Sequence, residues 1–462
     1  MRHSHLALAL LTAAVLAACG GNESTGGDQT LKNKFSGQVS FGDSLSDVGT
    51  YNVGAIKAAG GGRFTINGDN VAINPTLTGL GWTELIARQI GAPAPCPAVT
   101  GLEGDIAGFS VPVVANAGCF SYAQGGSRVT DPVGPHHKAV EPHFGALTYP
   151  VTRQIANHLA VSGGKFKGDE LVLIMAGGND VLGLLDKLTA DATAAGGAAG
   201  AAAGNVAFVT SLTMQLAAGT TNPATAAPQI GLAMQTEAAR PGSTSASLIG
   251  AGVTAAAQLG NVAAINPAVH LPMVAKAQAD ALAAGNAAGA KAGADFAAAN
   301  GPKQVALMAL AGTELAALTK TQVVGKGANF VVVANLPDVS LTPSSLAQSA
   351  SNQALVKAMV NAFNDALRNG VAGESKILYV DVYTVGQDQV KNPGPYGLTN
   401  VTAAACGANA VTGTSSLACT SKTLVAGDIS HYLYADTVHP TPFGHMLLAR
   451  YVSAQMIIKG WL

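Results

Sequence analysis

The chain has 462 residues, of which 48% are hydrophobic, 11% charged and 5% aromatic. This length predicts one large domain with insertions, or two domains. Lys and Arg (25) nearly balance Asp and Glu (26), so no basic face is expected for a nucleic-acid backbone and nucleic acid is excluded as a main partner. Recurring β-branched runs also exclude disorder of the whole chain.

Residues 1–18 have the three parts of an export signal. Arg2 supplies the positive charge, and residues 6–15 form the apolar stretch. Leu-Ala-Ala supplies the small residues of the cleavage site before Cys19. The apolar stretch is shorter than the roughly 20 residues that a membrane-spanning helix needs. We therefore expect an exported protein.

Leu-Ala-Ala-Cys resembles the bacterial lipobox, whose cysteine becomes the lipid-modified first residue of the mature protein. That resemblance implies lipidation of Cys19, with an ordinary cleaved signal as the alternative. Gly20 stands where inner-membrane lipoproteins usually carry Asp, which favours the outer membrane of the cell envelope. Residues 19–34 are then expected to form a tether.

Four further cysteines form an even set, which suits disulfides in an exported protein: Cys96, Cys119, Cys406 and Cys419. Three pairings are possible, and we favour the local one, Cys96–Cys119 with Cys406–Cys419. The chain contains no Cys-x-x-Cys pair, so we expect no metal site.

Five short apolar runs predict buried parallel strands: Gln38–Phe41, Val111–Ala115, Leu171–Met175, Phe330–Ala334 and Ile377–Val382. Helical patterns lie between or after them, over Trp82–Ile90, Pro150–Val161, Gln304–Leu318, Ser345–Gly370 and about Pro442–Ile458. This alternation predicts an α/β fold with a three-layer, doubly wound parallel sheet. Ligands of such sheets bind beyond the carboxyl ends of the strands.

Residues 189–301 differ in composition, because Ala, Gly, Thr and Asn dominate and charged residues are few. We expect an insertion of short helices and loops of modest stability, which divides the core into residues 35–188 and 302–462. A cap that offers an apolar surface to substrate is the alternative. A transmembrane segment is disfavoured because the uncharged stretches lack dense Leu, Ile and Phe.

Polar motifs follow three of the predicted strands. Ser44 lies in Phe41–Asp47, where a strand-to-helix turn would expose it at a helix N-terminus. Gly125-Gly126 follow the second strand, and paired glycines let backbone N–H groups approach a reacting oxygen. Asn179 follows the third strand, where its amide could donate to the same oxygen.

A fourth motif, Asp436-x-x-His439, precedes the last helix, and an Asp at this spacing can hold one ring nitrogen of the His. Each motif alone is a common turn or cap, but the four in this order resemble the GDSL, or SGNH, hydrolase family. Three connecting segments are also similar to that family: Gly62–Thr65, Trp82–Leu85 and Gln154–Asn157. The resemblance implies a flavodoxin-like fold and covers residues 35–188 and 302–462.

The resemblance makes Ser44 the nucleophile, His439 its general base and Asp436 the partner of the imidazole. It assigns the oxyanion hole to the backbone N–H groups of Ser44 and Gly126 and to the amide of Asn179. Gly125 is the alternative to Gly126 in that role. The chain departs from the family at Ser121, where many relatives have Asn.

The expected reaction is hydrolysis of short or medium acyl esters or lipids through an acyl-enzyme on Ser44, without metal or cofactor. The same residues serve polysaccharide deacetylases, phospholipases and acyltransferases of the family, and a non-catalytic surface-binding lipoprotein is the alternative outside enzymes. The membrane is an expected partner through the lipid anchor, whereas an obligate protein partner is not. His136, His137 and His143 are interpreted as a polar loop rather than a metal site.

Overall fold

The computed structural model describes residues 32–71 and 77–462. Cys19 and the export signal lie outside these residues, so their roles stay predictions. The chain forms two compact units. Unit 1 comprises the described residues up to Leu185 together with Lys303–Leu462, and unit 2 is Asp186–Pro302.

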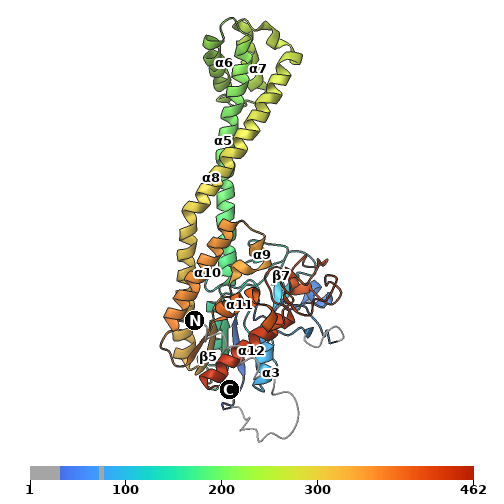
Figure 1. Ribbon diagram of the computed structural model, residues 1–462, viewed down its shortest axis with the longest axis vertical. Helices are drawn as coiled ribbons and strands as arrows, with labels where there is room; N and C mark the ends of the chain where they lie inside the picture. Colours follow the sequence, from blue (N-terminus) through green and yellow to red (C-terminus); the bar gives the residue numbers. More distant parts are fainter. Residues whose placement is uncertain (1–31, 72–76) are drawn as a thin grey trace. The chain divides into compact units, whose positions relative to one another are not determined.

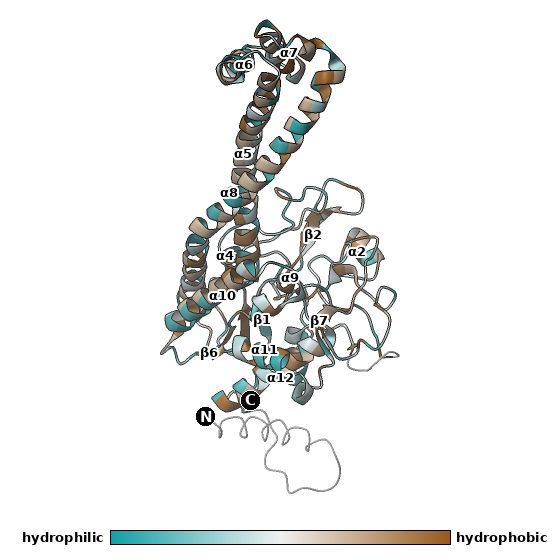
Figure 2. Ribbon diagram, turned by 45° about the horizontal axis from the view of Figure 1, so that its top comes forward, coloured by the Kyte–Doolittle hydropathy of each residue, from teal (hydrophilic) through white to brown (hydrophobic). Residues whose placement is uncertain are grey.

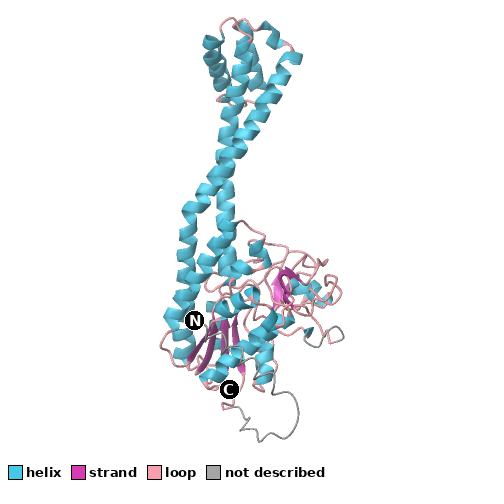
Figure 3. Cartoon of the chain, viewed as in Figure 1, coloured by secondary structure: helices cyan, strands magenta, loops and turns pink. Residues whose placement is uncertain are grey.

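Unit 1 is built on a parallel sheet of four strands in the order β1 (Gln38–Gly42), β4 (Leu171–Met175), β5 (Phe330–Ala334) and β6 (Ile377–Val380) (Figures 1 and 3). Four of the five predicted strands are thereby confirmed, in one parallel sheet. The α-helices that lie wholly in this unit are α2 (Gly54–Ala58), α3 (Trp82–Gln89), α4 (Val151–Val161), α9 (Pro343–Leu346), α10 (Ala350–Val371), α11 (Val382–Lys391) and α12 (Pro442–Lys459). Two further pairs of strands are β2 (Val99–Glu103) with β3 (Ser110–Ala115) and β7 (Asn400–Ala404) with β8 (Tyr432–Tyr434).

The fifth prediction, a buried parallel strand over Val111–Ala115, is wrong. This segment belongs to β3, which pairs antiparallel with β2 and is mostly exposed. Pro112 has no N–H to give to a second neighbour, which restricts the segment to an edge position. The chain beside β1 is instead Phe120–Tyr122, because Ser40 N–H donates to the Phe120 carbonyl and Tyr122 N–H donates to the Ser40 carbonyl.

Alternate residues of each sheet strand enter two different hydrophobic cores. Val331 and Val333 pack with residues of α4 and α10, whereas Val332 packs with Trp82 of α3 and Val452 of α12. Figure 1 shows α10 on one side of the sheet and α3 and α12 on the other. Burial on both faces explains why these strands are continuous apolar runs rather than alternating ones.

Unit 2 is helical, but its helices are not short as expected. It contains α6 (Pro223–Ala238), α7 (Ser245–Gln258) and parts of α5 (Gly178–Ala218) and α8 (Pro267–Leu318), helices of 41 and 52 residues. Hydrophilic and hydrophobic residues are intermixed along α8 (Figure 2). Within the described chain, α5 alone is long and apolar enough to meet the criteria for a membrane span, and one such helix is weak evidence.

Glycines explain how α5 and α8 pack closely within unit 2. A Cβ atom on Gly200 would lie 2.8 Å from the Gly285 carbonyl oxygen, and one on Gly196 would lie 2.7 Å from the Gly289 carbonyl oxygen. The glycines therefore do more than weaken the helices, because they let the two backbones approach. A separate core, which includes Leu216, forms among α5, α6, α7 and α8.

Candidate active site

Ser44 lies in a turn directly after β1. The expected helix N-terminus is not there, because the next helix, α2, begins only at Gly54. The turn is held by side chains instead. Asp43 Oδ1 accepts from Leu45 N–H at 3.1 Å, and the amide of Gln154 both accepts from Gly42 N–H and donates to the Gly42 carbonyl, each at 2.8 Å.

The loop between β8 and α12 brings His439 to Ser44. His439 Nε2 lies 2.8 Å from Ser44 Oγ, although the two residues are 395 positions apart. His439 Nδ1 lies 2.8 and 3.0 Å from the two carboxylate oxygens of Asp436. With Nδ1 protonated, the ring donates to Asp436 and leaves Nε2 to accept the serine hydroxyl proton.

Asp436 is buried and surrounded by donors. Its carboxylate accepts from the backbone N–H groups of Val438, His439 and Ser416 at 2.7 to 2.9 Å. Burial acts to raise the pKa of Asp436, but the imidazole and these hydrogen bonds outweigh it and hold the pKa well below its usual range. The carboxylate is therefore ionised at neutral pH, as a partner of a protonated imidazole must be.

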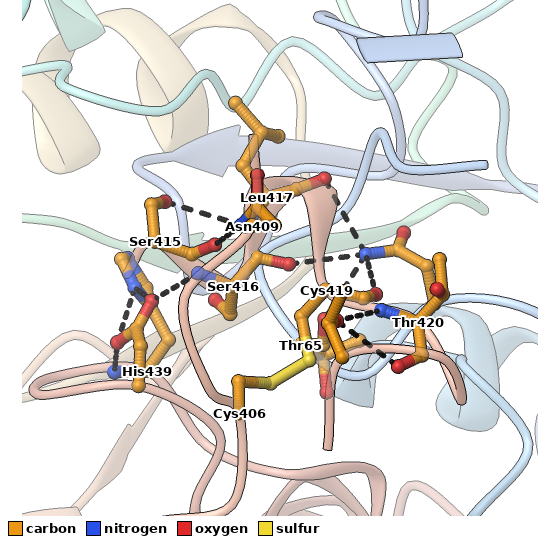
Figure 4. Close-up of a disulfide and its surroundings, with 12 residues drawn as sticks. Thr65, Cys406, Asn409, Ser415, Ser416, Leu417, Cys419, Thr420 and His439 are labelled. Atoms are coloured by element: carbon orange, nitrogen blue, oxygen red, sulfur yellow. Dashed lines mark hydrogen bonds and ion pairs between the residues drawn. A yellow bond between two sulfur atoms is a disulfide. The ribbon is translucent and has the colours of Figure 1, made fainter. Parts of the chain in front are cut away.

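The donor Ser416 belongs to a loop closed by a disulfide (Figure 4). The structure contains both disulfides of the local pairing, Cys96–Cys119 and Cys406–Cys419. The second encloses Ser416, whose carbonyl and that of Cys419 also accept from the amide of buried Asn67 at 3.1 Å each. Sequence reasoning missed Ser416 because it contributes a backbone group.

Gly126, rather than Gly125, has a free backbone N–H near the serine. Gly125 N–H donates to Asp47 Oδ2 at 3.0 Å, whereas no described residue accepts from Gly126 N–H. Gly126 has φ +80, and a Cβ there would lie 2.4 Å from the Pro135 carbonyl oxygen, so the position requires glycine. The amide of Asn179 donates one hydrogen to the Ser127 carbonyl at 2.9 Å and has a second to offer.

Three buried carboxylates support the surrounding loops. Burial raises the pKa of Asp43 to about 7 and that of Asp47 to about 6. Burial also raises the pKa of Asp180 to about 6, against the opposing effect of Arg128. Asp180 accepts from Val129 N–H at 3.1 Å and from the Arg128 guanidinium at 3.2 Å, so it orders the segment after Gly126.

These groups meet in one cavity of about 230 Å³ in unit 1. Ser44, Gly126, Asn179 and His439 all line it, and the Phe64 ring lies 4.8 Å from the imidazole, centroid to centroid. Most of the other lining side chains are apolar, including Leu182, Leu336, Leu341, Val385, Leu433 and Leu448. The arrangement can bind an apolar group beside an activated serine.

Metal-ligating residues do not gather in the described part of the chain. Residues 32–71 and 77–462 contain no group of three or more His, Cys, Asp or Glu side chains suited to a metal ion. His136 and His143 contact separate carboxylates, those of Glu141 and Asp105.

Comparison with known proteins finds relatives that are similar to part of the chain. No family model matches the chain. Three GDSL esterase/lipases of Arabidopsis thaliana are similar to it: At2g30220 (32% identity over 19% of this chain), At1g29670 (27% over 27%) and At2g40250 (24% over 27%). The matches cover 24%, 36% and 38% of these relatives' own lengths. These partial matches support membership of the GDSL, or SGNH, hydrolase family.

Proposed function

We propose that the protein hydrolyses carboxylic esters through an acyl-enzyme on Ser44. The observation that carries the proposal is the continuous chain of short contacts from Ser44 Oγ through His439 to Asp436. Similarity to GDSL esterase/lipases supports ester-bond hydrolysis at the family level.

In the proposed reaction, Ser44 Oγ attacks the ester carbonyl while His439 Nε2 takes its proton. The oxyanion is stabilised by the Ser44 and Gly126 N–H groups and by the Asn179 amide. The alcohol leaves with the proton from His439, and water activated by the same imidazole then releases the acid. Asp436 stays ionised throughout and stabilises the imidazolium.

The apolar lining of the cavity favours binding of a substrate with an apolar acyl group. Leu, Val and Phe side chains outnumber polar ones around Ser44, and transfer of each methylene from water is favourable by about 0.8 kcal/mol. We infer that short to medium acyl esters are preferred.

The test is hydrolysis of p-nitrophenyl esters from acetate to palmitate by protein lacking residues 1–18. We expect activity that falls at least about 10³-fold in Ser44→Ala, and covalent labelling of the native serine by an organophosphate. Equal activity in folded Ser44→Ala would refute the assignment.

Asn179→Ala tests the oxyanion hole separately. Because one donor to the oxyanion is lost, we expect kcat to fall about 10²- to 10³-fold with little change in KM. A folded Asn179→Ala protein with native kcat would remove this residue from the proposal.

We also propose that the fold of unit 1 has three layers, with helices on both faces of a doubly wound sheet. The two cores on opposite faces of the sheet support this arrangement.

We further propose that Cys19 carries a lipid anchor to the outer membrane. The Leu-Ala-Ala-Cys sequence supports this anchor. Metabolic labelling with palmitate that persists in Cys19→Ala would rule out the anchor.

A further inference from the structure

The cavity extends from the serine to one face of α11. Five residues of this helix line it, at spacings of three, four, seven and eight from the first: Val382, Val385, Gly386, Gln389 and Val390. Such spacing places them on a single helix face. The helix starts directly after β6, so its face meets the carboxyl-terminal edge of the sheet, where Ser44 also lies.

α11 is held firmly in this position. Asp381 caps its N-terminus by accepting from Thr384 N–H at 3.2 Å, and Tyr383 N–H donates to the Asn335 side chain at 3.0 Å. Gln387, next to the lining face, donates to Asp338 at 2.7 Å. The lining face is therefore a fixed wall.

Gly386 leaves an opening in that wall. A Cβ atom at this position would meet no heavy atom within 4 Å, and the backbone is not in the left-handed region. Neither close packing nor conformation therefore requires glycine here. Glycine in a helix interior is also less stable than alanine, so local stability does not favour it either.

We propose that this face of α11 binds the acyl chain of the ester and that Gly386 sets the length of chain accepted. The inference rests on the proposed function and names its substrate class, esters of unbranched aliphatic acids long enough to reach α11. The absent side chain of Gly386 leaves room for the distal methylenes, and the neighbouring valines contact them.

The experiment compares kcat/KM for p-nitrophenyl acetate, butyrate, octanoate and laurate in the native protein, Gly386→Ala and Gly386→Leu. We expect the laurate-to-acetate ratio of kcat/KM to fall at least tenfold in Gly386→Leu and less in Gly386→Ala. Each methylene excluded from the wall costs about fourfold in kcat/KM. The optimum should move to shorter chains.

Gly250→Leu is the matched control. Gly250 lies inside α7 with nothing within 4 Å of its Cβ position, and it does not line the cavity. Its laurate-to-acetate ratio should equal the native one. Should Gly386→Leu fail to fold, Gly386→Ala carries the comparison, because alanine favours the helix.

The outcomes separate this inference from the proposed function. An unchanged ratio in active Gly386 variants, or equal losses on acetate and laurate, overturns the role of Gly386. If the native protein hydrolyses the acetate ester but none of the esters with longer acyl chains, α11 does not bind the acyl chain. The proposed ester hydrolysis would still hold in that case. Folded native protein that hydrolyses none of the esters overturns the proposed function itself.

Discussion

His158 of α4 is buried among aromatic rings, those of Phe41, Tyr122 and Phe166. Neither of its ring nitrogens has a hydrogen-bond partner among the described residues. Burial, together with the charge of Lys167, lowers the pKa of His158 to about 4. The unfolded chain, where a histidine pKa is about 6.5, binds this proton more readily, so stability falls as the pH drops through the window between these values.

We expect His158→Phe to reduce this sensitivity to acid. Native protein should lose about 1–2 kcal/mol more of its free energy of unfolding between pH 7 and pH 5 than His158→Phe does. Urea unfolding at the two pH values measures the difference. Equal losses in the two proteins would mean that protonation of His158 is not coupled to unfolding.

The grouping of Ser44, Asp436 and His439 was predicted from the four motifs in the order typical of the GDSL family. The strand-end rule alone reaches only Ser44, because Asp436 and His439 follow β8, which is not part of the parallel sheet. Their catalytic roles stay predictions. Ser416 could not be predicted, because a backbone N–H has no residue-type signature. The one indication was the pair of cysteines that encloses it, Cys406 and Cys419.

The disulfide between Cys406 and Cys419 closes a loop whose Ser416 N–H donates to the Asp436 carboxylate. Replacing both cysteines by serine frees this loop and weakens the hydrogen bond from Ser416 N–H to Asp436. We expect kcat for p-nitrophenyl butyrate to fall about tenfold, a loss typical of one hydrogen bond to a charged group.

The matched control replaces Cys96 and Cys119 by serine. That disulfide also closes a short loop, but no residue between the two cysteines lines the cavity. The control should lose thermal stability with little loss of kcat. Equal losses of kcat in the two double variants would show that disulfides act only through global stability.

Gly200 and Gly197 of α5 lie one helical turn apart in different surroundings. A Cβ on Gly200 would lie 2.8 Å from the Gly285 carbonyl oxygen, whereas one on Gly197 would meet nothing within 4 Å. Gly197→Ala should therefore stabilise the protein by about 0.5–1 kcal/mol. Gly200→Ala should destabilise it by about 1–3 kcal/mol, because the helices must separate.

Thermal unfolding followed by circular dichroism at 222 nm distinguishes the two substitutions. Similar shifts of Tm in the same direction would mean that the close approach at Gly200 has no energetic weight.

Elements were predictable where local pattern and tertiary role agree. Leu171–Met175 and Phe330–Ala334 are strands with the predicted bounds, because both are apolar runs buried on two faces. Val111–Ala115 has a similar composition, yet Pro112 and the pairing with β2 make it an exposed edge. The lengths of α5 and α8 were missed because glycine propensity describes isolated helices and omits close helix packing.

At the scale of the whole molecule, the two units have separate cores. Every residue that lines the cavity around Ser44 belongs to unit 1, whereas the core of unit 2 lies entirely within residues 208–277. Ile230, in α6, is fully buried in that second core, and Leu232 in the same helix is 64% exposed. A carboxylate at the first position is buried without a partner, which costs several kcal/mol.

We therefore expect Ile230→Asp to unfold the core of unit 2 while kcat/KM for p-nitrophenyl butyrate stays within about twofold of the native value. Calorimetry should show loss of one thermal transition and retention of another, because each unit has a hydrophobic core of its own. Leu232→Asp is the control, since its carboxylate stays in water and should change neither readout. If Ile230→Asp abolishes ester hydrolysis together with all thermal transitions, the two units fold as one cooperative structure. Unfolding of unit 2 would then destabilise unit 1 through the helices α5 and α8, which carry residues of both units.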